Sequence, residues 1–123
     1  MAIVSVAVGG ALGCVLRYLV SGWLQGWTGV FFPLGTLAVN VAGSFVIGLV
    51  LGMGTGRFLL SPEWRLFLTT GFCGGLTTFS TFSYETLAFV EDRQWLPAAL
   101  NMVLNLALCG AAAFAGLSAG RTL

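Results

Sequence analysis

Long apolar stretches separated by short polar segments run through this chain of 123 residues. An α-helix needs about 20 predominantly apolar residues to cross the hydrocarbon core of a bilayer. The pattern predicts four such spans, with charged or aromatic residues between them at the depth of the lipid headgroups. The predicted spans cover residues 2–22, 33–54, 62–91 and 95–119.

The third predicted span contains poor helix formers at its middle. Gly74 and Gly75 are adjacent, and Thr77 and Thr78 follow. Glycine costs about 1 kcal/mol per site in a helix interior, and β-branched threonine costs less. Non-helical backbone at membrane depth survives only where protein or a water-filled cavity satisfies its polar groups. We therefore expect a helix break near Gly74–Thr78, with an ion bound at it.

Polar residues recur every four positions on two of the other spans. Asn40 and Ser44 do so on the second span, and Asn101, Asn105 and Cys109 on the fourth. Residues four apart share one helix face. A carboxamide inside the membrane is costly unless it is hydrogen-bonded. Two interpretations stay open for these faces: donors that line a pore, or hydrogen bonds between helices.

Composition identifies the class of protein. The chain is 58% hydrophobic and only 7% charged, whereas soluble domains carry about 25% charged residues. We therefore expect an integral membrane protein, with one domain over residues 1–123. The chain has no histidine, which excludes histidine metal ligands and a histidine general base. A net charge of +1 gives no indication of nucleic-acid binding, and the three cysteines lack the spacing of redox or zinc motifs.

The five arginines are divided almost evenly between the two sides of the predicted bundle. Four spans place both termini on one side, together with Arg57, Arg65 and Arg121. Arg17 and Arg93 lie on the other side. A bias of three against two is too small to fix an orientation by the positive-inside rule. We therefore expect the chain to insert in both orientations.

An aromatic pair follows the predicted break. Phe79 and Phe82 are three residues apart and share a helix face, with the hydroxyls of Ser80 and Thr81 beside them. The edge of a phenyl ring is electropositive, so a ring can partly solvate an anion. The sequence places no cation mid-membrane, which would leave such binding weak enough for release. The alternative is that both rings face lipid or the protein core.

Glu85 is the one carboxylate deep within a predicted span. Acidic residues inside membranes are rare and are functional candidates by default. Three roles stay open: pairing with a helix end, pairing with Arg17, or relaying protons. The last role defines the alternative function, a small dual-topology proton-coupled transporter.

The motif around the break carries a family resemblance. The signature of the Fluc (CrcB) fluoride channels is similar to Gly71-Phe-Cys-Gly-Gly-Leu-Thr-Thr-Phe-Ser-Thr-Phe-Ser-Tyr-Glu85. Residues 9–18, 35–44 and 101–109 resemble three further segments of that family, so the resemblance covers essentially the whole chain. It implies an all-α membrane protein of four transmembrane helices that is not an enzyme. It also implies passive export of fluoride from the cytoplasm across a bacterial inner membrane.

The resemblance implies partners as well. The chain would form an antiparallel, dual-topology homodimer in the lipid bilayer. Carbonyl oxygens of Gly74 and Thr77 would hold a structural sodium ion at the dimer centre. Arg17, Thr36 and Glu85 would lie at a vestibule or gate.

The resemblance also implies which residues line the fluoride pathway. They are Asn40, Phe79, Ser80, Thr81, Phe82, Asn101, Asn105 and Cys109. Cys109 departs from the family pattern, which has serine there. Because a thiol is a weaker donor than a hydroxyl, the pathway at this end would offer the anion a weaker hydrogen bond.

Overall fold

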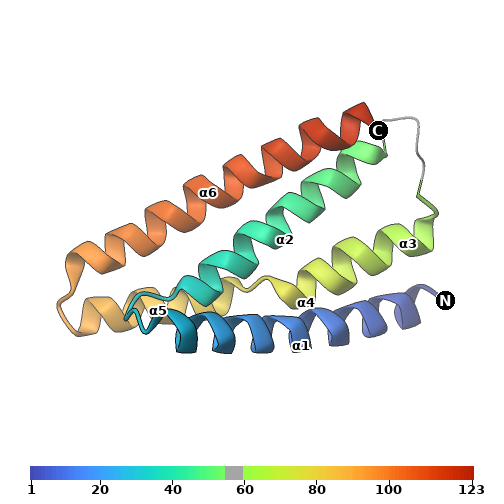
Figure 1. Cartoon of the computed structure of the whole chain (residues 1–123). Coiled ribbons are helices and arrows are strands. Elements are labelled where there is room, and N and C mark those ends of the chain that lie inside the picture. Colours follow the sequence, from blue (N-terminus) through green and yellow to red (C-terminus); the bar gives the residue numbers. More distant parts are fainter. Residues whose placement is uncertain (55–59) are drawn as a thin grey trace.

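The computed structural model describes residues 1–54 and 60–123, and helices make up nearly all of these two ranges (Figure 1). No strand occurs in the part that is described. The elements are α1 (Ala2–Thr28), α2 (Leu34–Met53), α3 (Pro62–Leu66), the π-helical segment η1 (Phe67–Cys73), α4 (Gly74–Leu76), α5 (Phe79–Glu91) and α6 (Trp95–Thr122).

In the part of the chain that the structure describes, three helices, α1, α2 and α6, are long and apolar enough to cross a membrane. The predicted third span is divided among α3, η1, α4 and α5, which begin and end at the predicted residues and leave only Thr77 and Thr78 outside a helix. The chain therefore has the four-helix membrane architecture expected from the pattern. Figure 1 shows both termini at the same end of the bundle, as four crossings require.

The boundary predicted for the first span was wrong. The helix does not end at residue 22 but continues through Trp23 and Trp27, whose rings stack with centroids 5.8 Å apart. It ends where Gly29 adopts a left-handed conformation with φ of 58°, which glycine accepts without steric cost. The other predicted boundaries differ by three residues or fewer, and Arg57 lies outside the described residues.

Helices α2 and α6 lie side by side along most of their length (Figure 1). Glycines line the contact on both helices. A Cβ atom on Gly48 would collide with the carbonyl oxygen of Ala113, and one on Gly116 would collide with that of Phe45. Small residues are needed here because they let the two helix backbones approach closely. Such close approach increases the van der Waals packing that drives association between membrane helices.

A second close contact joins α1 to the first part of the third span. Gly9 and Gly13 on α1 are buried against η1 and α4. A Cβ atom on Gly13 would collide with the carbonyl oxygen of Phe72, and one on Gly75 with that of Gly10.

Candidate functional site

The helix break lies at Thr77 and Thr78, whose backbone is extended. Their φ and ψ angles are −83° and 159°, and −153° and 118°. The hydroxyl of Thr78 caps α5 by accepting a hydrogen bond of 3.2 Å from the backbone N–H of Thr81. The break predicted near Gly74–Thr78 is therefore confirmed. Gly74 and Gly75 stay helical in α4, so only Thr77 and Thr78 leave the helical conformation.

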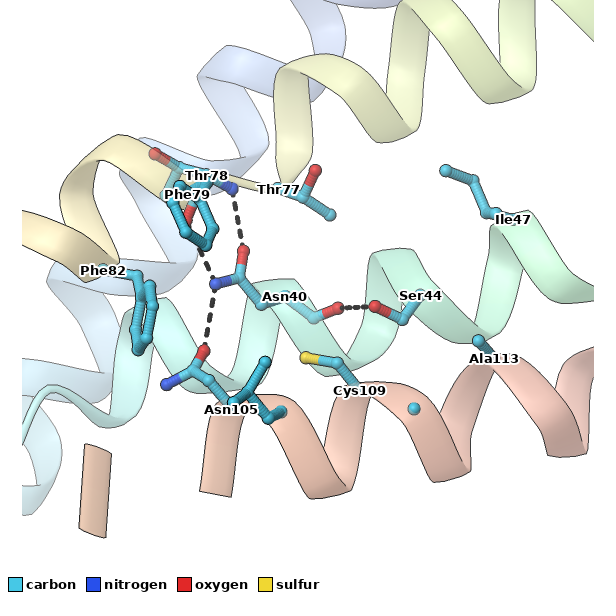
Figure 2. A pocket seen from close by; sticks show the side chains of 12 residues that line it. Asn40, Ser44, Ile47, Thr77, Thr78, Phe79, Phe82, Asn105, Cys109 and Ala113 are labelled. Carbon is cyan, nitrogen blue, oxygen red and sulfur yellow. Dashed lines mark hydrogen bonds between the residues drawn. The ribbon is translucent and has the colours of Figure 1, made fainter. Parts of the chain in front are cut away.

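One side chain from α2 holds the extended backbone. Oδ1 of Asn40 accepts from the N–H of Thr78 at 2.7 Å, and Nδ2 of Asn40 donates to the carbonyl of Thr78 at 3.1 Å (Figure 2). Each of these backbone groups would be costly in hydrocarbon without a partner. A carboxamide carries both an acceptor and donors, so Asn40 satisfies both groups at once.

The amides of α6 connect to this contact. Oδ1 of Asn105 accepts from Nδ2 of Asn40 at 3.1 Å. Nδ2 of Asn105 donates to the carbonyl of Asn101 at 2.9 Å and to its Oδ1 at 3.1 Å. Asn105 is 5% exposed and Asn101 is fully buried. The polar faces predicted on α2 and α6 therefore meet, and hydrogen bonds join them.

A cavity of about 450 Å³ opens where the break, α2, α5 and α6 come together (Figure 2). Its walls carry amides, hydroxyls, a thiol and two phenyl rings, and no charged side chain among the described residues lines it. The lining residues are Asn40, Ser44, Ile47, Thr77, Thr78, Phe79, Phe82, Asn105, Leu106, Cys109, Gly110 and Ala113. Asn101 is not among them and lies behind the cavity wall.

The two phenylalanines of the predicted pathway lie together at the cavity. The ring centroids of Phe79 and Phe82 are 5.4 Å apart, and the rings are tilted by 54°. Phe82 is 9% exposed, whereas Phe79 is 76% exposed on the single chain. Because the rings are tilted, the edge of one is directed differently from the edge of the other. Both rings line the cavity, and Phe79 also faces outward from the single chain.

The predicted hydroxyls lie on the outer side of α5. Ser80 and Thr81 are exposed and do not line the cavity of the single chain. Both are hydrogen-bonded to the hydroxyl of Thr78, at 3.3 and 3.0 Å. Tyr84 is also 73% exposed on this face. Five polar or aromatic residues within the six positions 79–84 are therefore exposed on a membrane-spanning segment: Phe79, Ser80, Thr81, Ser83 and Tyr84.

Arg17 reaches the break from α1. Its Nη1 donates to the carbonyl of Thr77 at 3.4 Å, and its Nη2 contacts the sulfur of Cys14 at 3.8 Å. Arg17 does not line the 450 Å³ cavity. The guanidinium therefore lies beside the extended backbone, and the cavity itself stays free of its charge.

Thr36 and Glu85 form a separate polar contact nearer the end of the bundle. The hydroxyl of Thr36 donates to Oε1 of Glu85 at 2.7 Å. Oε2 of Glu85 is buried and has no hydrogen-bond partner among the described residues. Glu85 also lines two smaller cavities, of about 160 and 350 Å³, which include residues of the loop before α2. The structure thus pairs Glu85 with a hydroxyl, and Arg17 contacts the break instead.

The carbonyls expected to hold sodium have lost their helical donors. In an unbroken helix the N–H of Thr78 would bond the carbonyl of Gly74, but it donates to Asn40 instead. Likewise the N–H of Thr81 donates to the Thr78 hydroxyl and not to the carbonyl of Thr77. Such oxygens suit a hard monovalent cation in kind, although the Thr77 carbonyl also accepts from Nη1 of Arg17 at 3.4 Å. Two carbonyls from one chain are too few to surround it.

Two residues of the site were not predicted from the sequence. Thr78 was recognised only as a poor helix former. Threonine is also a common N-cap residue, whose hydroxyl accepts from the backbone N–H two or three positions later. Thr86 was not singled out at all. Its hydroxyl accepts from Nδ2 of Asn101 at 2.9 Å. Nothing in its local sequence indicates that contact, because the partner lies on another helix.

The residues of this site fall within a match to a known family. Residues 4–117 match the family described as CrcB-like protein, Camphor Resistance (CrcB). The chain belongs to the CrcB-like family. The match includes every predicted site residue from Arg17 to Cys109. The resemblance deduced from the motif around the break is thereby confirmed.

Relatives of this CrcB-like chain are similar over nearly their full length. A protein of Geobacter sulfurreducens is 50% identical over 121 residues, which cover 98% of both chains, and is named fluoride-specific ion channel FluC. A protein of Geobacter metallireducens with the same name is 46% identical over 100% of this chain and 99% of its own. Another, from Shewanella oneidensis, is 50% identical over 85% of this chain and 83% of its own.

These findings establish the class of this CrcB-like protein. The relatives are bacterial and are named as ion channels, which are not enzymes. Together with the apolar helices, they identify a multi-pass bacterial membrane protein.

Proposed function

We propose that this chain is a fluoride channel, which exports fluoride from the cytoplasm passively, down its electrochemical gradient. The observation that carries the proposal is the cavity at the helix break, in a chain whose relatives are named fluoride-specific channels. Fluoride is small and strongly hydrated, so a pathway must replace its water with other positive dipoles. Phenyl edges and a thiol are available at the cavity, and the hydroxyls of Ser80 and Thr81 lie beside it. The hydroxyls of Ser44 and Thr77, which line the cavity, donate to backbone carbonyls at 2.7 and 2.8 Å.

The absence of charge from the cavity wall fits conduction. An ion channel needs sites that attract the ion enough to admit it and weakly enough to release it. A cationic side chain in the wall would hold fluoride as a salt bridge, and within residues 1–54 and 60–123 none lines this cavity. Arg17 lies close by on the break, where its field can favour anions without direct contact.

The exposed face of α5 supports assembly with a second copy. Ser80, Thr81 and Tyr84 would be costly to expose to lipid, and Phe79 beside them needs a partner surface if it is to line a closed pathway. A two-fold arrangement would cover the same face on both copies. The nearly balanced arginines favour an antiparallel pair of opposite topologies. The proposed functional unit is therefore an antiparallel homodimer.

A structural sodium ion belongs to the same proposal. The carbonyls of Gly74 and Thr77 would hold it, two from each copy. When bound, sodium would supply the positive charge that these carbonyl oxygens need in order to lie close together. The chain provides oxygen atoms that a helical ladder no longer uses, and glycine at residue 74 leaves the approach to them free of a side chain.

A direct test compares two anions. Purified protein is reconstituted into liposomes loaded with fluoride or chloride, and efflux is followed with an ion-selective electrode. We expect rapid fluoride release and chloride release near the rate of protein-free liposomes. Equal release of both anions, or none of either, would overturn the proposal.

The alternative, a proton-coupled transporter, rests on a different observation. Glu85 accepts one hydrogen bond from Thr36, and its second oxygen is buried without a partner among the described residues. A carboxyl group in that position is a candidate proton carrier. Transport coupled to protons would make the initial fluoride efflux rate follow an imposed pH gradient, whereas passive permeation would not.

A further inference from the structure

The side chains at the break belong to a longer series of hydrogen bonds that all run in one direction. The N–H of Thr78 donates to Oδ1 of Asn40 at 2.7 Å. Nδ2 of Asn40 then donates to Oδ1 of Asn105 at 3.1 Å, and Nδ2 of Asn105 donates to Oδ1 of Asn101 at 3.1 Å. Each amide therefore turns its oxygen toward the previous donor and its nitrogen toward the next acceptor.

The series ends on the helix that carries the aromatic pair. Nδ2 of Asn101 donates to Oγ1 of Thr86 at 2.9 Å, and the Thr86 hydroxyl donates to the carbonyl of Phe82 at 2.8 Å. We call Asn40, Asn105, Asn101 and Thr86 the amide relay. It starts at the backbone of the break and ends at the backbone of Phe82, so it braces the first turns of α5 from both ends.

The relay engages donors that an anion would otherwise use. Both hydrogens of the Asn40 amide are used, one by Thr78 and one by Asn105. Both hydrogens of the Asn105 amide are used by the carbonyl and side-chain oxygens of Asn101. In this arrangement Asn40 and Asn105, the two amides that line the cavity, donate only to other groups of the protein. They would donate to an anion only if the relay broke.

Asn101 is the amide of the relay that does not line the cavity. It is fully buried and does not line the cavity wall. If its amide were reversed, its NH₂ would face the NH₂ of Asn105, and its oxygen would face the Thr86 hydroxyl, which already donates to Phe82. The observed orientation of Asn101 is therefore the one that agrees with Asn105 and Asn40, whose direction is set by the backbone of Thr78.

We propose that Asn101 is a positioning residue: it joins the amide relay to Thr86 on α5 and thereby holds Phe79 and Phe82 in the arrangement that conducts. This inference rests on the proposed channel function. It assigns Asn101 an indirect role, exerted through Asn105, Asn40 and Thr86, without contact with the ion.

The cleanest perturbation is at the end of the relay. Thr86→Val is nearly isosteric and removes the acceptor for Asn101. Thr86→Ser keeps the hydroxyl and should therefore behave like the wild type. Thr69→Val is the matched control, because Thr69 makes the same hydroxyl bond to a carbonyl four residues earlier, at 2.8 Å, with no amide donating to it. Asn101→Leu removes the relay at its centre.

Two readouts are needed, and the first is independent of fluoride transport. Hydrogen–deuterium exchange of a peptide covering residues 77–82 reports whether the break has loosened. We expect faster exchange in Thr86→Val and Asn101→Leu, and wild-type exchange in Thr86→Ser and Thr69→Val. Unchanged exchange in both disrupting variants would overturn the inference, whether or not the protein transports fluoride.

The second readout is the fluoride efflux rate per folded protein, together with the ratio of fluoride to chloride flux. We expect both to fall about tenfold in Thr86→Val, the fold-change that a single disrupted buried hydrogen bond can cause. A relay that acts as a unit also predicts that Thr86→Val adds little to Asn101→Leu. Faster exchange with wild-type rate and ratio would show that the relay is scaffold only. Absence of fluoride flux in the wild type would instead refute the proposed function.

Discussion

The side chain that holds the break offers the sharpest test of how this site works. Asn40→Asp keeps the size of the side chain and changes its hydrogen bonding. The aspartate still accepts from the N–H of Thr78, which lies 2.7 Å from Oδ1 of Asn40. The two bonds that Asn40 donates, to the carbonyl of Thr78 and to Oδ1 of Asn105, both at 3.1 Å, become contacts between oxygen atoms.

The cost follows from those two contacts. A buried acceptor left unsatisfied costs about 1–3 kcal/mol, so two cost about 2–6 kcal/mol. This is a large part of the roughly 5–15 kcal/mol that stabilises a typical folded protein. Since about 1.4 kcal/mol corresponds to a tenfold change, we expect Asn40→Asp to lower fluoride efflux at least tenfold and to lower the unfolding midpoint.

The assay measures initial fluoride efflux from liposomes that contain equal amounts of folded protein, beside thermal unfolding in detergent. Gln94→Glu is the control, because it makes the same amide-to-carboxylate change at the start of α6, outside the cavity. It should leave both quantities near wild type. Wild-type efflux and midpoint in Asn40→Asp would refute the reasoning. A normal midpoint with lost efflux would indicate repulsion of the anion and not a loosened break.

Three further predictions concern the rings, the packing and the assembly. Phe79→Ile and Phe82→Ile should abolish fluoride efflux while size-exclusion elution stays normal, because such swaps usually cost under about 1.5 kcal/mol but remove the ring edge; wild-type rates in both would make the rings scaffold. Gly116→Ala should lower the unfolding midpoint by colliding with α2, whereas Gly22→Ala, which meets open space, should not. Lysines added to one terminus should abolish activity by forcing one orientation, and co-expression with oppositely biased copies should restore it; full activity from one forced orientation would contradict the antiparallel dimer.

The spans and the break followed from the sequence because the membrane imposes them. A bilayer requires long apolar segments, and a glycine and threonine cluster inside one of them has few explanations. The end of the first helix did not follow. Trp23 and Trp27 suit both a helix and an interfacial turn, and only Gly29 marks the actual end. The π-helical stretch of η1 was not predicted either, since its residues carry no local signal for it.

The candidate site, too, was predictable only in part from the sequence. The every-four spacing brought Asn40, Asn105 and Cys109 to one cavity, and the motif placed Phe79 and Phe82 there too. The sequence left open whether the amides line a pore or join helices. Their orientation depends on partners from three helices, which no local pattern encodes. The structure shows the joining bonds.

The central claim, passive and selective passage of fluoride, is tested most directly in one vesicle. Liposomes containing the protein are loaded with fluoride and chloride together, and both ions are followed with electrodes while the pH gradient across the membrane is varied. The account predicts that fluoride leaves and chloride stays, at a fluoride rate that does not depend on the pH gradient. Release of chloride alongside fluoride, or a fluoride rate that follows the pH gradient, would contradict it.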